Sequence, residues 1–81
     1  MKKLEFYHAE WCGPCRIMKP VLTELKDAGM SIRMYDIEED SKKAREMGIM
    51  GVPTMIIYNG TEELTRLMGV QSKENIAYYM S

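Results

Sequence analysis

The chain has 81 residues, of which 46% are apolar and 28% charged; we therefore expect one globular domain over residues 1–81, not a disordered or fibrous chain. Its 11 basic and 12 acidic side chains give a net charge of −1, so neither nucleic acid nor an anionic membrane is an expected partner. No apolar run approaches the roughly 20 residues of a membrane span, and the first residues lack a signal-peptide pattern, which predicts a cytoplasmic protein.

The first predicted elements are a strand and a long amphipathic helix. Alternating residues over Lys2–Tyr7 indicate a short strand, which leads directly into the segment Trp11–Cys15. The helix begins at this segment and ends at Gly29. Pro20 lies inside it and is expected to kink it, because proline has no N–H and crowds the preceding turn. The apolar stripe of the helix consists of Ile17, Met18, Val21, Leu22 and Leu25.

The second half of the chain is predicted to contain three strands and a short helix. Residues Ser31–Ile37 are rich in strand formers, and the acidic residues after them suit the start of a helix that runs to about Met47. The continuous apolar run Thr54–Tyr58 is typical of a central strand that is covered on both faces. Asn59-Gly60 then predicts a tight hairpin, with Glu62–Met68 returning antiparallel.

A last helix is predicted after Ser72, its N-cap, with Ile76, Tyr79 and Met80 on the apolar face. The predicted order is therefore β-α-β-α-β-β-α, in an α/β fold with a mixed sheet. The first two strands are joined by a helical crossover, which should be right-handed and make them parallel. This places the start of the first helix at the carboxyl end of the first strand, where the sites of α/β proteins gather.

Two cysteines are too few for the disulfide framework of a small secreted protein, so Cys12 and Cys15 are predicted to serve chemistry. Gly13-Pro14 between them gives the bend that allows a disulfide to close. Cys12 falls at the helix N-terminus, where unpaired N–H groups favour the thiolate, and it is the predicted nucleophile. Cys15 lies one turn inside the helix; we expect it to be more buried and to attack second, resolving a mixed disulfide.

Two other interpretations of the cysteine pair stay open at this point. A structural disulfide is disfavoured, because the ring is small and the predicted compartment is reducing. A structural zinc site usually needs four ligands. The cysteine pair and His8, the one histidine of the chain, supply only three. A closed zinc site would therefore lack one ligand unless the chain dimerises.

With these motifs the sequence resembles the thioredoxin family over nearly its whole length. The matching segments are the active-site segment Ala9–Cys15, Pro20 in the helix, the loop Gly51–Thr54, the hairpin Asn59-Gly60, and Gly69. The resemblance implies a thioredoxin-like fold in a minimal form, a four-stranded mixed sheet with helices on both faces. The active-site strand begins at Lys2, so the strand and helix that usually precede it in the family are missing from these 81 residues.

The resemblance also implies an activity and a site. The implied protein is a dithiol–disulfide oxidoreductase with no bound cofactor or metal, a monomer that acts on disulfide-containing proteins and is recharged by thioredoxin reductase or a similar enzyme. The peptide bond before Pro53 is expected to be cis, with its loop packed against the cysteines. A substrate groove is implied at Trp11, Val52, Pro53 and Gly69, beside the motif residues Gly13 and Pro14. Met50 is a candidate for a further apolar contact.

This sequence departs from the family at the residues expected beneath the second cysteine. Most thioredoxins bury an aspartate and a lysine there, whereas this chain has Phe6 and Met34. No carboxylate would then assist proton loss from Cys15. His8 stands where many members have a tryptophan, on the same face of the strand as Phe6, and is a candidate for pKa tuning or proton transfer.

Two alternative functions are kept. One is a glutaredoxin-like electron donor to a specific enzyme such as ribonucleotide reductase, although the glutathione site of glutaredoxins is not recognisable in Met68–Gln71. The other is a non-catalytic binding subunit that docks a partner through Trp11, Val52 and Pro53. Intact cysteines at a position that favours a thiolate count against the second alternative.

Overall fold

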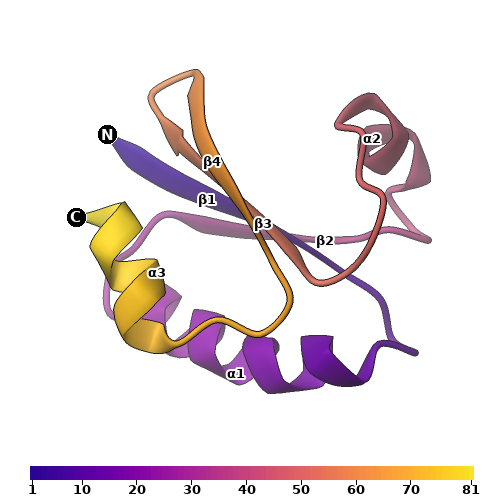
Figure 1. Ribbon diagram of the computed structural model, residues 1–81, viewed down its shortest axis with the longest axis horizontal. Helices are drawn as coiled ribbons and strands as arrows, with labels where there is room; N and C mark the ends of the chain where they lie inside the picture. The colour runs from indigo at the N-terminus through magenta and orange to yellow at the C-terminus, as the bar shows by residue number, and fades with distance from the viewer.

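The computed structural model describes residues 1–81 and places the predicted elements in the predicted order (Figure 1). These elements are β1 (Lys2–His8), α1 (Gly13–Asp27), β2 (Ile32–Asp36), α2 (Ser41–Glu46), β3 (Thr54–Asn59), β4 (Glu62–Met68) and α3 (Lys73–Met80). Each boundary lies within a few residues of the one predicted from the sequence. The hydroxyl of Ser72 accepts the N–H of Asn75 at 3.0 Å, the contact expected of the N-cap of α3.

The four strands form one mixed sheet in the order β2-β1-β3-β4. β1 runs parallel to β2, with Phe6 opposite Met34, and antiparallel to β3. β3 and β4 form the predicted hairpin, and Gly60 in its turn has the positive φ of 65° that glycine adopts most easily. β3 is an inner strand whose residues 54–57 are all buried, because helices cover both faces of the sheet there.

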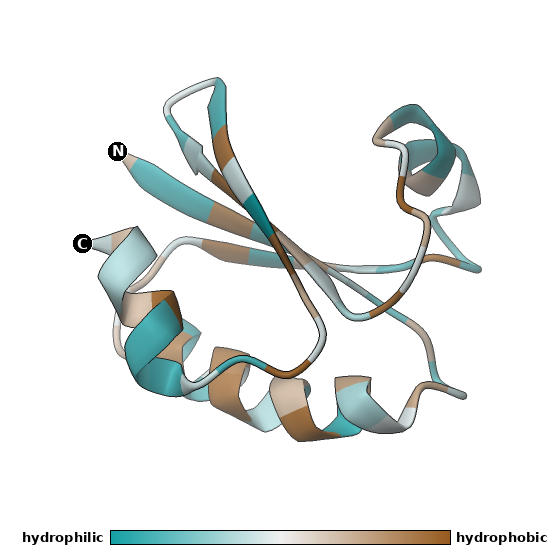
Figure 2. Cartoon of the chain, viewed as in Figure 1, coloured by the Kyte–Doolittle hydropathy of each residue, from teal (hydrophilic) through white to brown (hydrophobic).

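The main core lies between the sheet and the helices α1 and α3, which both cover the same face (Figure 1). Hydrophobic segments recur along both helices in Figure 2. The buried residues of these helices are Cys15, Met18, Leu22, Leu25, Ile76 and Met80. The expectation that Ile17 belongs to this stripe is wrong: it is 57% exposed, because the buried line runs through positions 15, 18, 22 and 25 of α1. α1 continues past Pro20, and the kink there stays a prediction.

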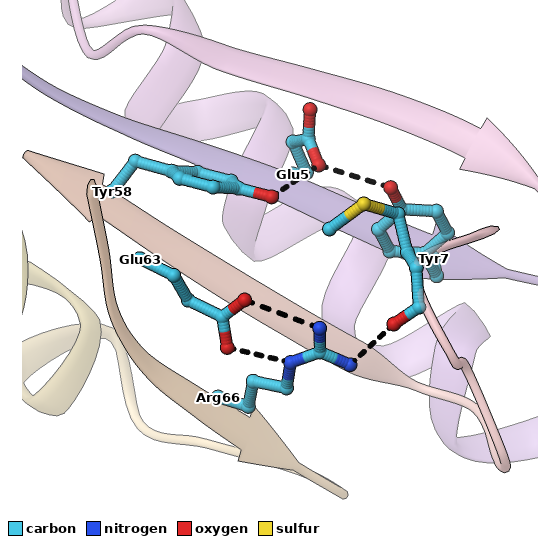
Figure 3. Close-up of polar contacts among 6 residues, drawn as sticks. Glu5, Tyr7, Tyr58, Glu63 and Arg66 are labelled. Atoms are coloured by element: carbon cyan, nitrogen blue, oxygen red, sulfur yellow. Dashed lines mark hydrogen bonds and ion pairs between the residues drawn. The ribbon is translucent and has the colours of Figure 1, made fainter. Parts of the chain in front are cut away.

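The helix α2 lies on the opposite side of the sheet from α1 and α3 (Figure 1), and this side carries a polar cluster around Glu5 (Figure 3). One carboxylate oxygen of Glu5 accepts the hydroxyls of Tyr7 at 2.9 Å and Tyr58 at 3.1 Å. The other oxygen lies 3.7 Å from the ammonium of Lys43 on α2, and the Lys43 ammonium also lies over the ring of Tyr35. This cluster joins β1, β2 and β3 to α2, whose buried residue is Ala44.

We expect Leu22→Ala to lower the free energy of unfolding by about 2–5 kcal/mol, because the leucine side chain is completely buried between α1 and the sheet. Ile17→Ala is the matched control on the same helix. Since Ile17 is mostly exposed, its free energy of unfolding should change by about 0.5 kcal/mol or less. Urea denaturation of the oxidised proteins measures both values. Equal losses in the two variants would contradict the packing described here.

The Glu5 cluster predicts a loss of stability at alkaline pH. Burial and the neighbouring Glu5 raise the pKa of Tyr58 from 10.0 to about 12, and burial also raises the pKa of Tyr7. The folded protein holds the phenol proton of Tyr58 more tightly than the unfolded chain does, and this difference contributes to stability. The contribution is complete below pH 10.0, the pKa of the phenol in the unfolded chain, and it is lost as the pH rises towards about 12. Absorbance titration of the phenols should show these late transitions. In Glu5→Gln the pKa of Tyr58 should fall, and a titration identical to that of the unchanged protein would contradict the cluster.

Candidate active site

The two cysteines lie where β1 ends and α1 begins, at the carboxyl end of the parallel strands β1 and β2 (Figure 1). The connection is a tight turn in which the N–H of Cys12 donates to the carbonyl of Ala9 at 3.1 Å. Ala9 is itself buried in the core, so the turn is anchored from below. This short connection places the start of α1 directly over the end of β1.

Cys12 is the N-cap of α1, and its Sγ accepts the backbone N–H of Cys15 at 3.2 Å. Pro14 between them has no N–H, so it adds no unpaired donor to the first turn. Cys12 and Cys15 are joined as a disulfide, with their Cα atoms 5.3 Å apart. The arrangement that caps the helix is therefore also one that favours negative charge on the sulfur of Cys12 once the pair is reduced.

The expected difference in burial between the two cysteines is not seen in this oxidised state. Cys12 is 4% exposed and Cys15 is 3% exposed, because the closed disulfide holds both side chains against the core. What distinguishes the two residues is their surroundings. Cys15 lines a charged cleft, described below, and Cys12 does not.

The loop between α2 and β3 carries the predicted groove residues. Its Val52–Pro53 peptide bond is cis, and Pro53 is buried. The carbonyl of Pro53 accepts the N–H of Gly69 at 3.0 Å, which brings these two predicted groove residues together. Val52 packs against the core cluster that contains both cysteines, and its own N–H and carbonyl make no hydrogen bond within the chain. An extended peptide could therefore pair with the backbone of Val52.

β4 holds this loop at both ends. Arg66 donates two hydrogen bonds to the carboxylate of Glu63, at 2.6 and 3.1 Å, and a third to the carbonyl of Met47 at 2.7 Å (Figure 3). Met47 is the C-cap of α2, where carbonyls lack helical partners and favour a cation. At the other end of the loop, the N–H of Gly69, just after β4, donates to the carbonyl of Pro53. Sequence reasoning missed Arg66, because nothing local to β4 indicates that it reaches α2.

Several exposed apolar side chains are neighbours in sequence of Cys12 or of the predicted groove residues. Trp11, next to Cys12, is 65% exposed, and Met50 in the cis-proline loop is 96% exposed. Met68 and Val70 on either side of Gly69 are also exposed. These exposed side chains come from three separate segments of the chain, and one of them is the predicted Met50.

A cleft of about 550 Å³ opens beside Cys15, at the ends of β1 and β2. The residues that line it are His8, Ala9, Glu10, Cys15, Arg16, Lys19, Met34, Asp36, Glu39 and Asp40. His8 stacks on Phe6 with their ring centres 5.1 Å apart, as strand alternation predicted. Burial lowers the pKa of His8 below its ordinary value, and the nearby Lys19 lowers it further. The imidazole is therefore mainly neutral at pH 7.

Sequence reasoning singled out His8 and Met34, and it took Glu10 as a solvated residue; it did not place the remaining charged residues at this site. Two signals were present: Lys19 lies one helical turn after Cys15, and Asp36 ends the strand predicted to run parallel to β1. No cluster of three or more His, Cys, Asp or Glu side chains is arranged to hold a metal ion. None of the helices has the length and apolar character needed to cross a membrane.

The fold and the paired cysteines at the start of α1 define a protein built for thiol–disulfide exchange. The family model of thioredoxin matches residues 3–81, so the chain belongs to the thioredoxin family. The thioredoxin of Staphylococcus haemolyticus strain JCSC1435 is 37% identical over 78 residues, 93% of this chain and 75% of that protein. The thioredoxin of Alicyclobacillus acidocaldarius is 36% identical over 73 residues, 86% of this chain and 70% of that protein.

Solved structures agree with this assignment. A single-residue variant of the thioredoxin of Halobacterium salinarum NRC-1 superposes with a TM-score of 0.90 at 26% identity, covering 98% of this chain and 71% of that one. Family and site together make the chain a protein dithiol–disulfide oxidoreductase that works through the Cys12/Cys15 pair. They do not favour the glutaredoxin-like donor or the non-catalytic binding subunit.

In the reduced protein we expect Cys12 to be alkylated by iodoacetamide much faster than Cys15 at neutral pH, because only the sulfur of Cys12 caps the helix and accepts an N–H. Peptide mapping by mass spectrometry after short exposure to the reagent measures the two rates separately. Faster alkylation of Cys15 would contradict the capping argument.

Proposed function

We propose that Cys12 is the nucleophile of the exchange reaction and Cys15 the resolving thiol. The hydrogen bond from the Cys15 N–H to the Sγ of Cys12 is the observation that supports this most directly, since it favours the thiolate of Cys12 in the reduced protein. Gly13 and Pro14 support the same geometry: Gly13 leaves open space beside the disulfide, and Pro14 suits the first helical turn.

The reaction has two steps in this proposal. The Cys12 thiolate attacks one sulfur of a substrate disulfide, forms a mixed disulfide with it and releases the other sulfur as a thiolate. Cys15 then loses its proton and attacks the Sγ of Cys12, which releases the second substrate thiolate and closes the Cys12–Cys15 disulfide. Both released thiolates take up protons, and two electrons have passed from the protein to its substrate.

We propose that the substrate lies across the cis-proline loop. The free N–H and carbonyl of Val52 can pair with an extended peptide next to the disulfide. Pro53 and Gly69 keep the loop in place, and Gly69 has no side chain to block the approach. Trp11 and the exposed methionine at position 50 would contact apolar residues on either side of the substrate cysteine.

The remaining proposals concern the setting of this reaction. The disulfide itself carries the electrons, so no bound cofactor or metal takes part, and a thioredoxin reductase or similar enzyme restores the dithiol. Such a cycle belongs in a reducing compartment, the cytoplasm. We propose that residues 1–81 act as one domain and as a monomer on disulfide-containing proteins, without nucleic acid or membrane partners.

Serine variants of the two cysteines test this assignment of roles. Cys12→Ser should abolish reduction of insulin disulfides in the presence of dithiothreitol, because no nucleophile remains. Cys15→Ser should also lose turnover but should accumulate a covalent mixed disulfide with the substrate, visible on non-reducing gels and lost on adding a thiol.

The double serine variant is the control for the binding-subunit alternative. If it still captures the same partner proteins from solution as the unchanged protein, binding does not depend on the cysteines. Normal turnover by either single variant would overturn the proposed mechanism.

A further inference from the structure

The cleft beside Cys15 suggests how this protein manages the proton of its second thiol. Before Cys15 can attack the mixed disulfide, its S–H must lose a proton, because the thiolate is the nucleophile. Cys15 is almost completely buried, and burial disfavours the charged thiolate. The reaction therefore benefits from a group that accepts this proton as the new sulfur–sulfur bond forms.

The residues beneath the disulfide supply no such group. Phe6 is fully buried in the core, and Met34 lies opposite it on β2. Neither side chain titrates. The charged cleft that Cys15 lines is therefore the place to look for a proton acceptor.

Among the cleft residues, His8 is the side chain suited to this task. It stacks on Phe6, and its carbonyl accepts the N–H of Ile37 at 2.9 Å, so both ring and backbone are held. The next residue, Ala9, accepts the N–H of Cys12 and connects this part of β1 rigidly to the disulfide. His8 and Cys15 thus line the same cleft from β1 and α1, the two elements that meet at the active site.

The charges that face His8 come from every element around the cleft. Lys19 and Arg16 are on α1, Asp36 is at the end of β2, and the acidic residues that precede α2, Glu39 and Asp40, complete the wall together with Glu10. The effects of burial and Lys19 exceed those of the three acids Asp36, Glu39 and Asp40, so the pKa of His8 stays below 6.5. A neutral imidazole can accept a proton; a protonated one cannot.

We propose that His8 accepts the proton of the Cys15 thiol, directly or through solvent in the cleft, while Cys15 attacks the mixed disulfide on Cys12. The sulfur–sulfur bond between Cys15 and Cys12 forms, the bond between Cys12 and the substrate breaks, and the substrate leaves as a thiolate. The proton on His8 then passes through the open cleft to solvent and to the departing thiolate. This role rests on the proposed function of the two cysteines and adds a proton-transfer residue to it.

A chromogenic aryl disulfide, dithiobis-nitrobenzoate, separates the two chemical steps when it is mixed with an equimolar amount of the reduced protein. Attack by Cys12 releases the first coloured thiolate, and attack by Cys15 releases the second. Stopped-flow absorbance measured over a range of pH therefore gives one rate constant for each cysteine in the same trace. A missing second release in Cys15→Ser verifies which phase belongs to Cys15.

For the unchanged protein we expect the rate constant of the second release to rise with pH to an inflection below 6.5 and then to level off, as His8 becomes neutral. In His8→Gln the rate constant at neutral pH should fall by roughly 10²-fold. It should also keep rising towards alkaline pH without levelling, because hydroxide and water then take the proton. The first release should be unchanged, since Cys12 does not line the cleft.

Two further variants distinguish proton transfer from a structural role. His8→Ala should regain part of the second rate constant when imidazole is added, because the cleft is open and large enough to admit it. Lys19→Met keeps His8 but removes the cation that lowers its pKa, so the inflection should move to higher pH. Glu39→Gln is the matched control of opposite sign and should move the inflection lower.

The levelling of the second phase decides the outcome. If His8→Gln shows the same levelling as the unchanged protein, or if imidazole fails to accelerate His8→Ala, His8 is not the proton acceptor. Should His8→Ala fail to fold, an inflection that does not move in Lys19→Met and Glu39→Gln overturns the proposal equally. Failure of the proposed function is a separate result: the first release itself would then be slow or absent in the unchanged protein.

Discussion

The packing of α1 against the sheet is the contact on which the active site depends. Met18 and Leu22 are completely buried on the sheet side of this helix, and a short turn closed by the hydrogen bond from Cys12 to Ala9 links the helix to β1. The N-terminus of α1 is therefore held at the carboxyl end of β1. There the backbone N–H of Cys15 meets the sulfur of Cys12, so a contact that completes the helix also favours the reactive thiolate.

β4 has a comparable role for the other wall of the site. It is an edge strand and is largely exposed, so its contribution to the core is small. Its contacts with the cis-proline loop are specific: Arg66 binds the carbonyl of Met47 at the start of the loop, and Gly69 binds that of Pro53 near its end. Between these two points the backbone of Val52 is left unpaired in a rigid frame. Preorganisation of this kind lowers the entropy that the loop itself would have to lose when a peptide binds.

The two sulfurs of the disulfide face different surroundings. The exposed apolar residues Trp11 and Met50 belong to the segments proposed to contact the substrate, and they lie next to Cys12 and close to Val52 in the chain. Cys15 instead lines the cleft that holds His8 and the charged ends of β1, β2 and α1. In the proposed mechanism this separation has a physical reason, because a bound protein substrate would exclude water from the sulfur of Cys12 while the sulfur of Cys15 exchanges a proton with solvent. One small disulfide can thus combine apolar recognition with proton transfer.

The sequence by itself determined the elements, their order and the cysteine pair, because these depend on neighbours along the chain: the apolar run Thr54–Tyr58, the turn at Asn59-Gly60, and the spacing of Cys12 and Cys15. Periodicity alone misplaced Ile17, since an apolar residue at the border of a helix stripe does not show which side the sheet will cover. Only the tertiary structure decided that Arg66 reaches α2 and that His8 shares a cleft with Cys15. These contacts join residues far apart in sequence, and their geometry follows from how the ends of strands and helices pack in space.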